Sequence, residues 1–129
     1  MIMRLALLLF SMAALSACAS MAPMGQHDCK NPGQIPINVK YGDSELRVVP
    51  YMAHADPGDA LRFKLDGNLG IKVTVAGKDA RAAWIKGDGS NKFFFVCVPE
   101  NQARGVNYEY EVTVQGVGTL DPVVRIYEL

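Results

Sequence analysis

The sequence predicts an all-β protein, an antiparallel β-sandwich of about seven strands that follows an N-terminal segment of different character. From residue 35 onward, apolar and polar residues alternate in one segment after another, which is typical of half-buried strands. These segments are rich in β-branched and aromatic residues, and Gly, Pro, Asp and Asn separate them. About seven such segments in a single domain of this size favour two packed sheets.

The N-terminal segment has the layout of a secretory signal. Arg4 precedes an apolar run from Leu5 to Leu15, and small residues follow it. A basic start with roughly 7–15 apolar residues is typical of a signal peptide, whereas a transmembrane helix needs about 20. We therefore expect residues 1–17 to be a cleaved signal peptide.

The four residues Leu15-Ser16-Ala17-Cys18 resemble the lipobox of bacterial lipoproteins. The resemblance covers only the first eighteen residues, and the alternative is an ordinary signal with a chance cysteine. It implies cleavage before Cys18 and a diacylglyceryl group, with acyl chains such as palmitate, on the Cys18 sulfur. Two acyl chains give stable membrane attachment. Because Ala19 rather than Asp follows, the resemblance also implies the outer membrane, facing the periplasm.

Two further cysteines, Cys29 and Cys97, remain beyond the lipobox. An even number in an exported protein favours a disulfide. The bridge would close a loop of about 68 residues, for which chain entropy contributes on the order of 4 kcal/mol. We predict this disulfide; two free thiols or a metal site are the alternatives.

Composition indicates one domain of nearly neutral charge. Removing 17 residues from 129 leaves 112, with 12 basic and 13 acidic side chains, which suits a single domain. We expect residues 18–34, which lack periodicity, to be a lipidated tether and loop, and residues 35–129 to be the sandwich. This charge argues against nucleic acid as a partner, because binding it requires neutralisation of phosphates.

The predicted strands follow one another along residues 35–41, 46–52, 61–65, 71–75, 93–98, 108–114 and 123–129. Pro36 and Pro50 place their strands at an edge or a bulge. The 93–98 strand is apolar on both faces, so we expect it to be central. Turns are predicted at 41–44, 56–59 and 66–68, a loop at 117–119, and a short helical turn within 79–85.

The strand count, a late-strand cysteine and the single Trp84 resemble the cupredoxin-like and immunoglobulin-like sandwiches. The immunoglobulin hallmark fails, because Cys29 precedes the first strand. A blue-copper site requires two His and usually an axial Met beside a Cys. Neither His nor Met follows Cys97, so that site is excluded and no cofactor is expected.

A candidate partner-binding loop contains Trp84, Lys86 and Asp88, because loops on rigid scaffolds often carry binding sites. This Trp and Lys-Gly-Asp run resembles that of small envelope lysozyme inhibitors, which implies as one alternative an inhibitor of a cell-wall hydrolase. The other alternative for these residues is a core tryptophan followed by a hairpin turn.

Two histidine-containing clusters are weaker candidates. Met21, Met24 and His27 have side chains that suit copper(I), which leaves a copper-binding periplasmic protein as an alternative to a plain tether. His54 lies near Asp56 and Asp59 in the sequence and is a candidate base, but no nucleophile is identifiable beside it. We expect a lipid-anchored envelope protein with a binding or structural role, an envelope protein as its partner, and no catalysis.

Overall fold

The computed structural model describes residues 28–65, 72–89 and 93–129. The predicted signal peptide, Cys18 and the cluster of Met21, Met24 and His27 lie outside these residues, as does the predicted turn at 66–68. Within the described chain, no helix has the length and apolar character needed to cross a membrane.

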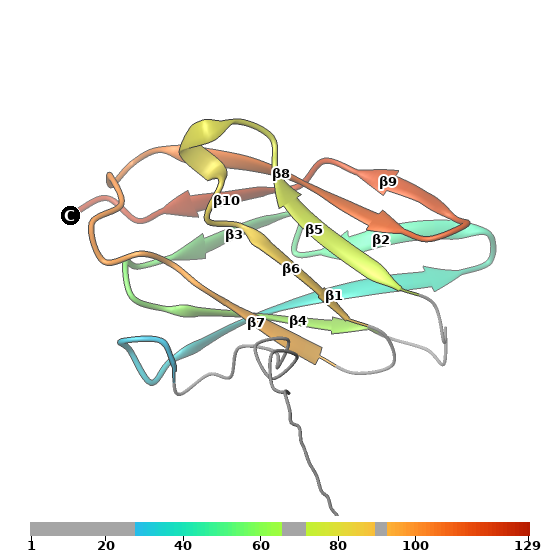
Figure 1. Cartoon of the computed structure of the whole chain (residues 1–129), viewed down its shortest axis with the longest axis horizontal. Coiled ribbons are helices and arrows are strands. Elements are labelled where there is room, and N and C mark those ends of the chain that lie inside the picture. The colour runs from blue at the N-terminus through green and yellow to red at the C-terminus, as the bar shows by residue number, and fades with distance from the viewer. Residues whose placement is uncertain (1–27, 66–71, 90–92) are drawn as a thin grey trace, which may run out of the picture.

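Two β-sheets form the molecule, as the alternation of the sequence predicts. One has the strand order β2-β1-β4-β7, and the other has the order β3-β10-β8-β5-β6, with β9 also paired to β8. Figure 1 shows β1, β4 and β7 in one layer and β5, β8 and β10 in the other. The strands are β1 Gln34–Gly42, β2 Glu45–Val49, β3 Met52–Ala55, β4 Ala60–Leu65, β5 Val73–Gly77, β6 Lys86–Gly89, β7 Phe93–Cys97, β8 Asn107–Val114, β9 Gly118–Leu120 and β10 Val123–Ile126.

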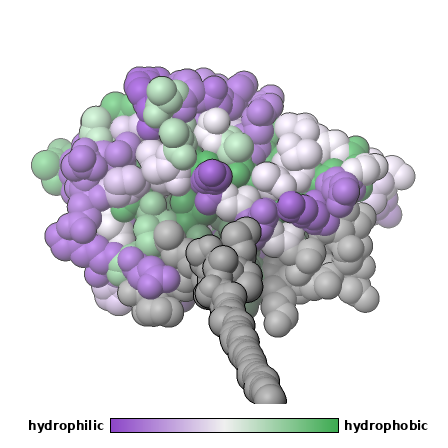
Figure 2. All heavy atoms as spheres, in the orientation of Figure 1, coloured by the Kyte–Doolittle hydropathy of each residue, from purple (hydrophilic) through white to green (hydrophobic). Residues whose placement is uncertain are grey.

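The core fills the space between the two inner faces. Strict alternation of exposed and buried residues along β8 gives that strand one inner and one outer face. At the centre, the Phe63 ring of β4 stacks on Phe94 of β7 at 5.2 Å and meets the edge of Tyr110 of β8 at 5.8 Å. These ring contacts join the two sheets and confirm the predicted sandwich. Hydrophilic residues cover much of the surface seen in Figure 2.

Two strand pairs are parallel, so the prediction of a wholly antiparallel sandwich is wrong in this detail. β1 pairs with β4 in parallel, and β10 pairs with β3 in parallel. Parallel neighbours need a crossover connection. Here the chain leaves the first sheet after β2, forms β3 in the second sheet and returns as β4.

The predicted strand at 46–52 is two strands in two sheets. β2 ends at Val49 and β3 begins at Met52, with Pro50 and a cis Val49–Pro50 peptide bond between them. The apolar alternation of the sequence runs on to Met52, but Met52 is exposed, and the core-facing positions shift from Leu46 and Val48 in β2 to Ala53 and Ala55 in β3. β1 is not an edge strand, because it lies between β2 and β4. Pro36 lies in the part of β1 that pairs with β4 but extends beyond the end of β2.

The 93–98 strand is not central. Among the described strands, β7 pairs with β4 alone and forms an edge of its sheet. Phe94 and Val96 enter the core, whereas Phe93 on the outer face is 53% exposed. Apolar residues therefore occupy both faces of β7 although only its inner face is buried in the core.

Two short strands were not expected. Residues 117–119 were predicted as a loop, but Gly118–Leu120 pairs with β8 as β9. The glycine-containing segment Lys86–Gly89 pairs with β5 as β6. A Cβ atom added to Gly87 or Gly89 would lie 3.0 or 2.9 Å from the Phe94 ring. These glycines therefore let the ring pack directly on the β6 backbone.

The local turn predictions for the described residues are confirmed. Asp43 and Ser44 both have positive φ, 52° and 61°, as a two-residue hairpin turn requires. At 56–59, Gly58 has a φ of 92° and the Asp59 amide donates to the Asp56 carbonyl at 3.1 Å. The predicted helical turn is the 3-10 helix η3 Ala80–Ala82, whose N-terminus is capped by the Asp79 carboxylate.

Candidate functional site

The predicted disulfide is present and lies on the outer face of the four-stranded sheet. Cys29 and Cys97 are joined at an S–S distance of 2.06 Å, with Cα atoms 5.2 Å apart. Cys97 alternates with the buried Phe94 and Val96 and so turns outward. Its register partner Ala60 also turns outward yet has no exposed surface, and its amide donates to the Gly33 carbonyl. Residues 28–33 therefore cover this end of the outer face.

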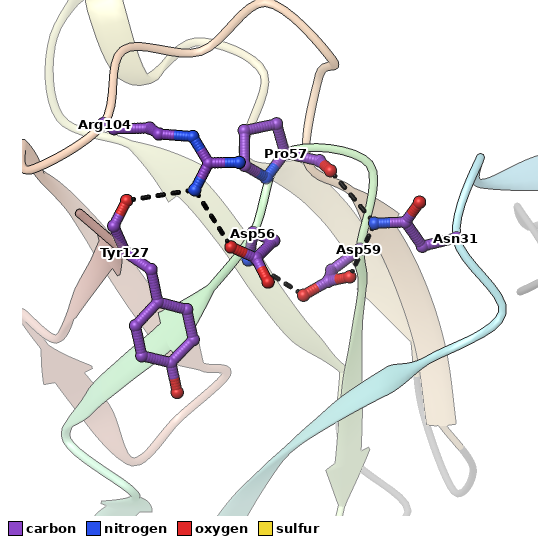
Figure 3. A network of polar contacts seen from close by, with 6 residues as sticks. All are labelled: Asn31, Asp56, Pro57, Asp59, Arg104 and Tyr127. Carbon is purple, nitrogen blue, oxygen red and sulfur yellow. Dashed lines mark hydrogen bonds and ion pairs between the residues drawn. The ribbon is translucent and has the colours of Figure 1, made fainter. Parts of the chain in front are cut away.

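A polar network holds the same N-terminal segment against the 56–59 turn (Figure 3). The Asn31 amide group donates to Asp59 at 2.9 Å and to the Pro57 carbonyl at 3.0 Å. Asp59 in turn accepts from the Asp56 backbone amide, and Arg104 donates to the Asp56 carboxylate at 3.1 Å. The network thus fixes the segment that leads toward Cys18. It also gives the carboxylates of Asp56 and Asp59 a structural role.

The structure does not join His54 to the carboxylates with which the sequence associates it. The exposed His54 ring stacks on Tyr127 at 5.4 Å. Asp56 and Asp59 are occupied by Arg104, Asn31 and the turn itself. Among the described residues, no three His, Cys, Asp or Glu side chains gather as a set of metal ligands.

The candidate loop of Trp84, Lys86 and Asp88 is a loop only at Trp84. The indole is half-buried and meets Tyr108 edge-on at 5.6 Å. Lys86 and Asp88 are exposed on β6, and Asp88 lies 3.7 Å from the Lys72 ammonium. Their contribution to partner binding stays a prediction.

A surface that the sequence analysis missed lies on the outer face of the four-stranded sheet. We call it the basic aromatic face, and it consists of Lys40, Arg47, Arg62, Lys64, Phe93 and Phe95. Strand register places these residues side by side. Lys40 is opposite Arg47, Lys64 is opposite Phe93, and Arg62 is opposite Phe95.

Contacts within the basic aromatic face confirm that its members adjoin. The Phe93 and Phe95 rings meet edge-to-face at 5.5 Å, and the Arg62 guanidinium lies 6.0 Å from the centre of the Phe93 ring. Aromatic rings attract such cations through the negative charge of their faces. The Nε atom of Arg62 is buried and has no hydrogen-bond partner among the described residues.

The electrostatic character of this face differs from that of the opposite sheet. Among the outward positions of β1, β2, β4 and β7, Glu45 at the hairpin corner is the one acidic residue. Within the described chain, no ion pair involves Arg47, Arg62 or Lys64. The other sheet carries charges of both signs, and several of them are paired, as in the Lys72–Asp88, Lys78–Asp121 and Arg125–Glu128 pairs. A nearly neutral composition therefore conceals a cationic surface.

One sequence signal points to this face. In the strands between residues 35 and 65, the polar members of the alternation include four cations and one carboxylate. The two phenylalanines come from a strand some thirty residues further on, so strand pairing alone brings them to the cations. Comparison with known protein families finds no matching family, and comparison with curated proteins finds no match. The geometry of the described residues is therefore the basis for the proposed function.

Proposed function

We propose that this protein is a lipid-anchored lipoprotein of the bacterial cell envelope, whose β-sandwich binds a partner without catalysis. The Cys29–Cys97 disulfide carries the proposal. Structural disulfides persist in oxidising compartments such as the periplasm and are rare in the cytosol. The bridge thus supports export, as do the signal-like residues 1–17 and the lipobox that ends at Cys18.

The position of the bridge supports a tethered arrangement. Cys29 is bonded to β7, and Asn31 is bonded to the 56–59 turn. A pull on the chain from the direction of Cys18 would therefore load the disulfide and this hydrogen-bond network rather than the end of β1. Such a point of attachment suits a domain held at a membrane by its N-terminus.

The basic aromatic face supports a binding role. Guanidinium and ammonium groups keep their charge at neutral pH, so they suit charge recognition better than proton transfer. Large exposed rings such as Phe93 provide contact area at low conformational cost. The face also lies on a regular sheet, which holds these side chains in fixed register.

The hydrolase-inhibitor alternative has less support than this binding role. It needs Lys86 on a projecting loop, whereas Lys86 lies in β6 and is paired with Ala76 of β5. The copper alternative rests on Met21, Met24 and His27, which lie outside the described residues.

Mass spectrometry of the protein purified from its native membranes tests the anchor. We expect a mature chain that begins at Cys18 and carries the added mass of acyl chains. A Cys18→Ala variant, expressed in parallel, should lose both the acyl mass and the membrane attachment. An intact leader, or a mature start elsewhere without acyl mass, would contradict the proposal.

A further inference from the structure

We propose that the basic aromatic face docks on the surface of an anionic phospholipid bilayer. The orientation of this face toward the bilayer rests on the proposed lipid anchor. The affinity of the face for anionic lipid needs no anchor, so the two proposals can fail separately.

Charge supports an anionic surface as the occupant. Lys40, Arg47, Arg62 and Lys64 project from three adjacent strands of one sheet face. Near an anionic membrane, each Lys or Arg raises partitioning by about fivefold. A sheet face that presents several cations in one plane matches the planar array of lipid phosphates.

The aromatic side chains supply the apolar part of the contact. Phe93 is 53% exposed, and it lies beside Phe95 at one edge of the face. Interfacial segments insert such rings at the boundary between headgroups and acyl chains, while lysine and arginine extend their charged ends to the phosphates. Arg62 lies against Phe93, so cation and ring would reach the interface together.

The attachment point lies on the same face. Cys97 turns outward two residues beyond Phe95 on β7 and holds Cys29 there. Ten residues, 19–28, separate Cys18 from Cys29, and covalent geometry limits the distance between the two cysteines to about 40 Å. The lipid anchor would therefore hold this face near the bilayer at a high effective concentration, at which weak docking suffices.

Other occupants fit the face less well. A second copy of this chain would oppose its cations to identical cations, which repel one another. An acidic polypeptide would match the charge, but it would not explain why the chain leading to the lipidated cysteine starts on this face.

Binding to lipid vesicles tests the proposal. The chain from Ala19 onward contains every described strand and the disulfide, and it lacks the apolar leader and the acyl chains that would themselves bind lipid. We expect the oxidised chain to sediment with vesicles that contain phosphatidylglycerol, much less with pure phosphatidylcholine vesicles, and less as salt is added.

Charge reversal assigns this binding to the face. Arg47→Glu combined with Lys64→Glu should lower partitioning to the anionic vesicles at least tenfold, as the loss of two cations near the surface implies. Both residues are exposed, so the fold should persist, which circular dichroism checks. The matched control is Lys78→Glu combined with Arg81→Glu, which reverses two exposed cations outside the basic aromatic face and should bind like the parent chain.

Fluorescence quenching tests the orientation. In Phe93→Trp, brominated anionic lipid should quench the new indole, whereas the parent chain, with Trp84 alone, should be quenched little. The proposal is overturned if the charge-reversed variant binds anionic vesicles as the parent chain does, or if the parent chain binds neutral vesicles equally well. It is also overturned if the parent chain is retained on immobilised polyglutamate but does not bind anionic vesicles. If lipid docking fails while Cys18 proves acylated, the anchor stands without it.

Discussion

At the scale of single residues, close contacts with the backbone depend on glycines, because a glycine has no Cβ atom. Gly87 and Gly89 leave room for the Phe94 ring, and Gly77 leaves room for the chain that follows η3. A Cβ atom on Gly77 would lie 1.8 Å from the Ala82 carbonyl oxygen. Because backbone atoms cannot rotate away as a side chain can, this contact tolerates no addition.

Gly77→Ala is therefore expected to destabilise the fold. Overpacking of this kind costs about 1–3 kcal/mol, occasionally more, and the clash with backbone places Gly77→Ala at or above the upper end. Urea unfolding followed by circular dichroism measures the change. The matched control is Gly42→Ala, where a Cβ atom would meet nothing within 4 Å; a loss at Gly77 no larger than at Gly42 would contradict the prediction.

Tyr110 carries a second residue-scale constraint. Its side chain has no exposed surface, and its hydroxyl has no hydrogen-bond partner among the described residues. Burial raises the pKa of this hydroxyl far above its ordinary value, and Tyr51 raises the pKa further. The folded chain therefore keeps this proton at an alkaline pH at which the unfolded chain releases it.

The sign of this linkage predicts the behaviour of Tyr110→Phe. Above about pH 10 the unfolded state binds fewer protons than the folded state, so stability falls by about 1.4 kcal/mol per pH unit from this group. Tyr110→Phe should remove that loss, and at pH 7 it should be neutral or stabilising because it removes an unpaired buried hydroxyl. Urea unfolding of the parent and variant chains at neutral and alkaline pH measures these free energies of unfolding. If both chains lost the same stability at alkaline pH, the linkage would be refuted.

At the scale of elements, local patterns predict where strands and turns lie better than they predict strand partners. The alternation located the residues of β1, β4 and β8, and positive-φ turn chemistry located the 41–44 and 56–59 turns. The assignment failed at 46–52 and at 86–89. In the first, the apolar alternation of the sequence runs on to Met52, although Met52 is exposed in a strand of the other sheet. In the second, glycines indicate a loop although the segment pairs as β6.

The disulfide acts at this scale, because it fastens an otherwise irregular segment to β7. It closes a loop of 68 residues, and removing such a bridge from a small exported domain costs about 2–5 kcal/mol. Reduction should lower the free energy of unfolding by that amount and should expose residues 28–33 to proteolysis.

A variant with both Cys29→Ala and Cys97→Ala is the control for reduction. It should be destabilised to a similar extent, and reductant should not change its stability further. If reduction left the stability and protease sensitivity of the parent chain unchanged, the bridge would have no part in fixing the segment.

At the scale of the whole molecule, the two outer faces differ in charge although the composition is nearly neutral. One sheet turns Lys40, Arg47, Arg62 and Lys64 outward, and the other carries charges of both signs, some of them paired. The expectation that near-neutral charge argues against nucleic acid as a partner rests on the composition and not on the charge of each face. Docking on anionic lipid belongs to this scale, because it depends on strands from distant parts of the chain.

By itself, the sequence determined the positions of most strands, the side-chain sets that share a face along them, and the two cysteines that pair. These follow from local alternation and from the small number of cysteines. Only the tertiary structure decided the parallel pairs, the edge position of β7, and the meeting of cations, phenylalanines and the Cys29 attachment on one face. The physical reason is that a strand with one apolar face can pair with many neighbours of similar pattern. The choice among them depends on the packing of the complete core, to which residues far apart in the chain contribute together.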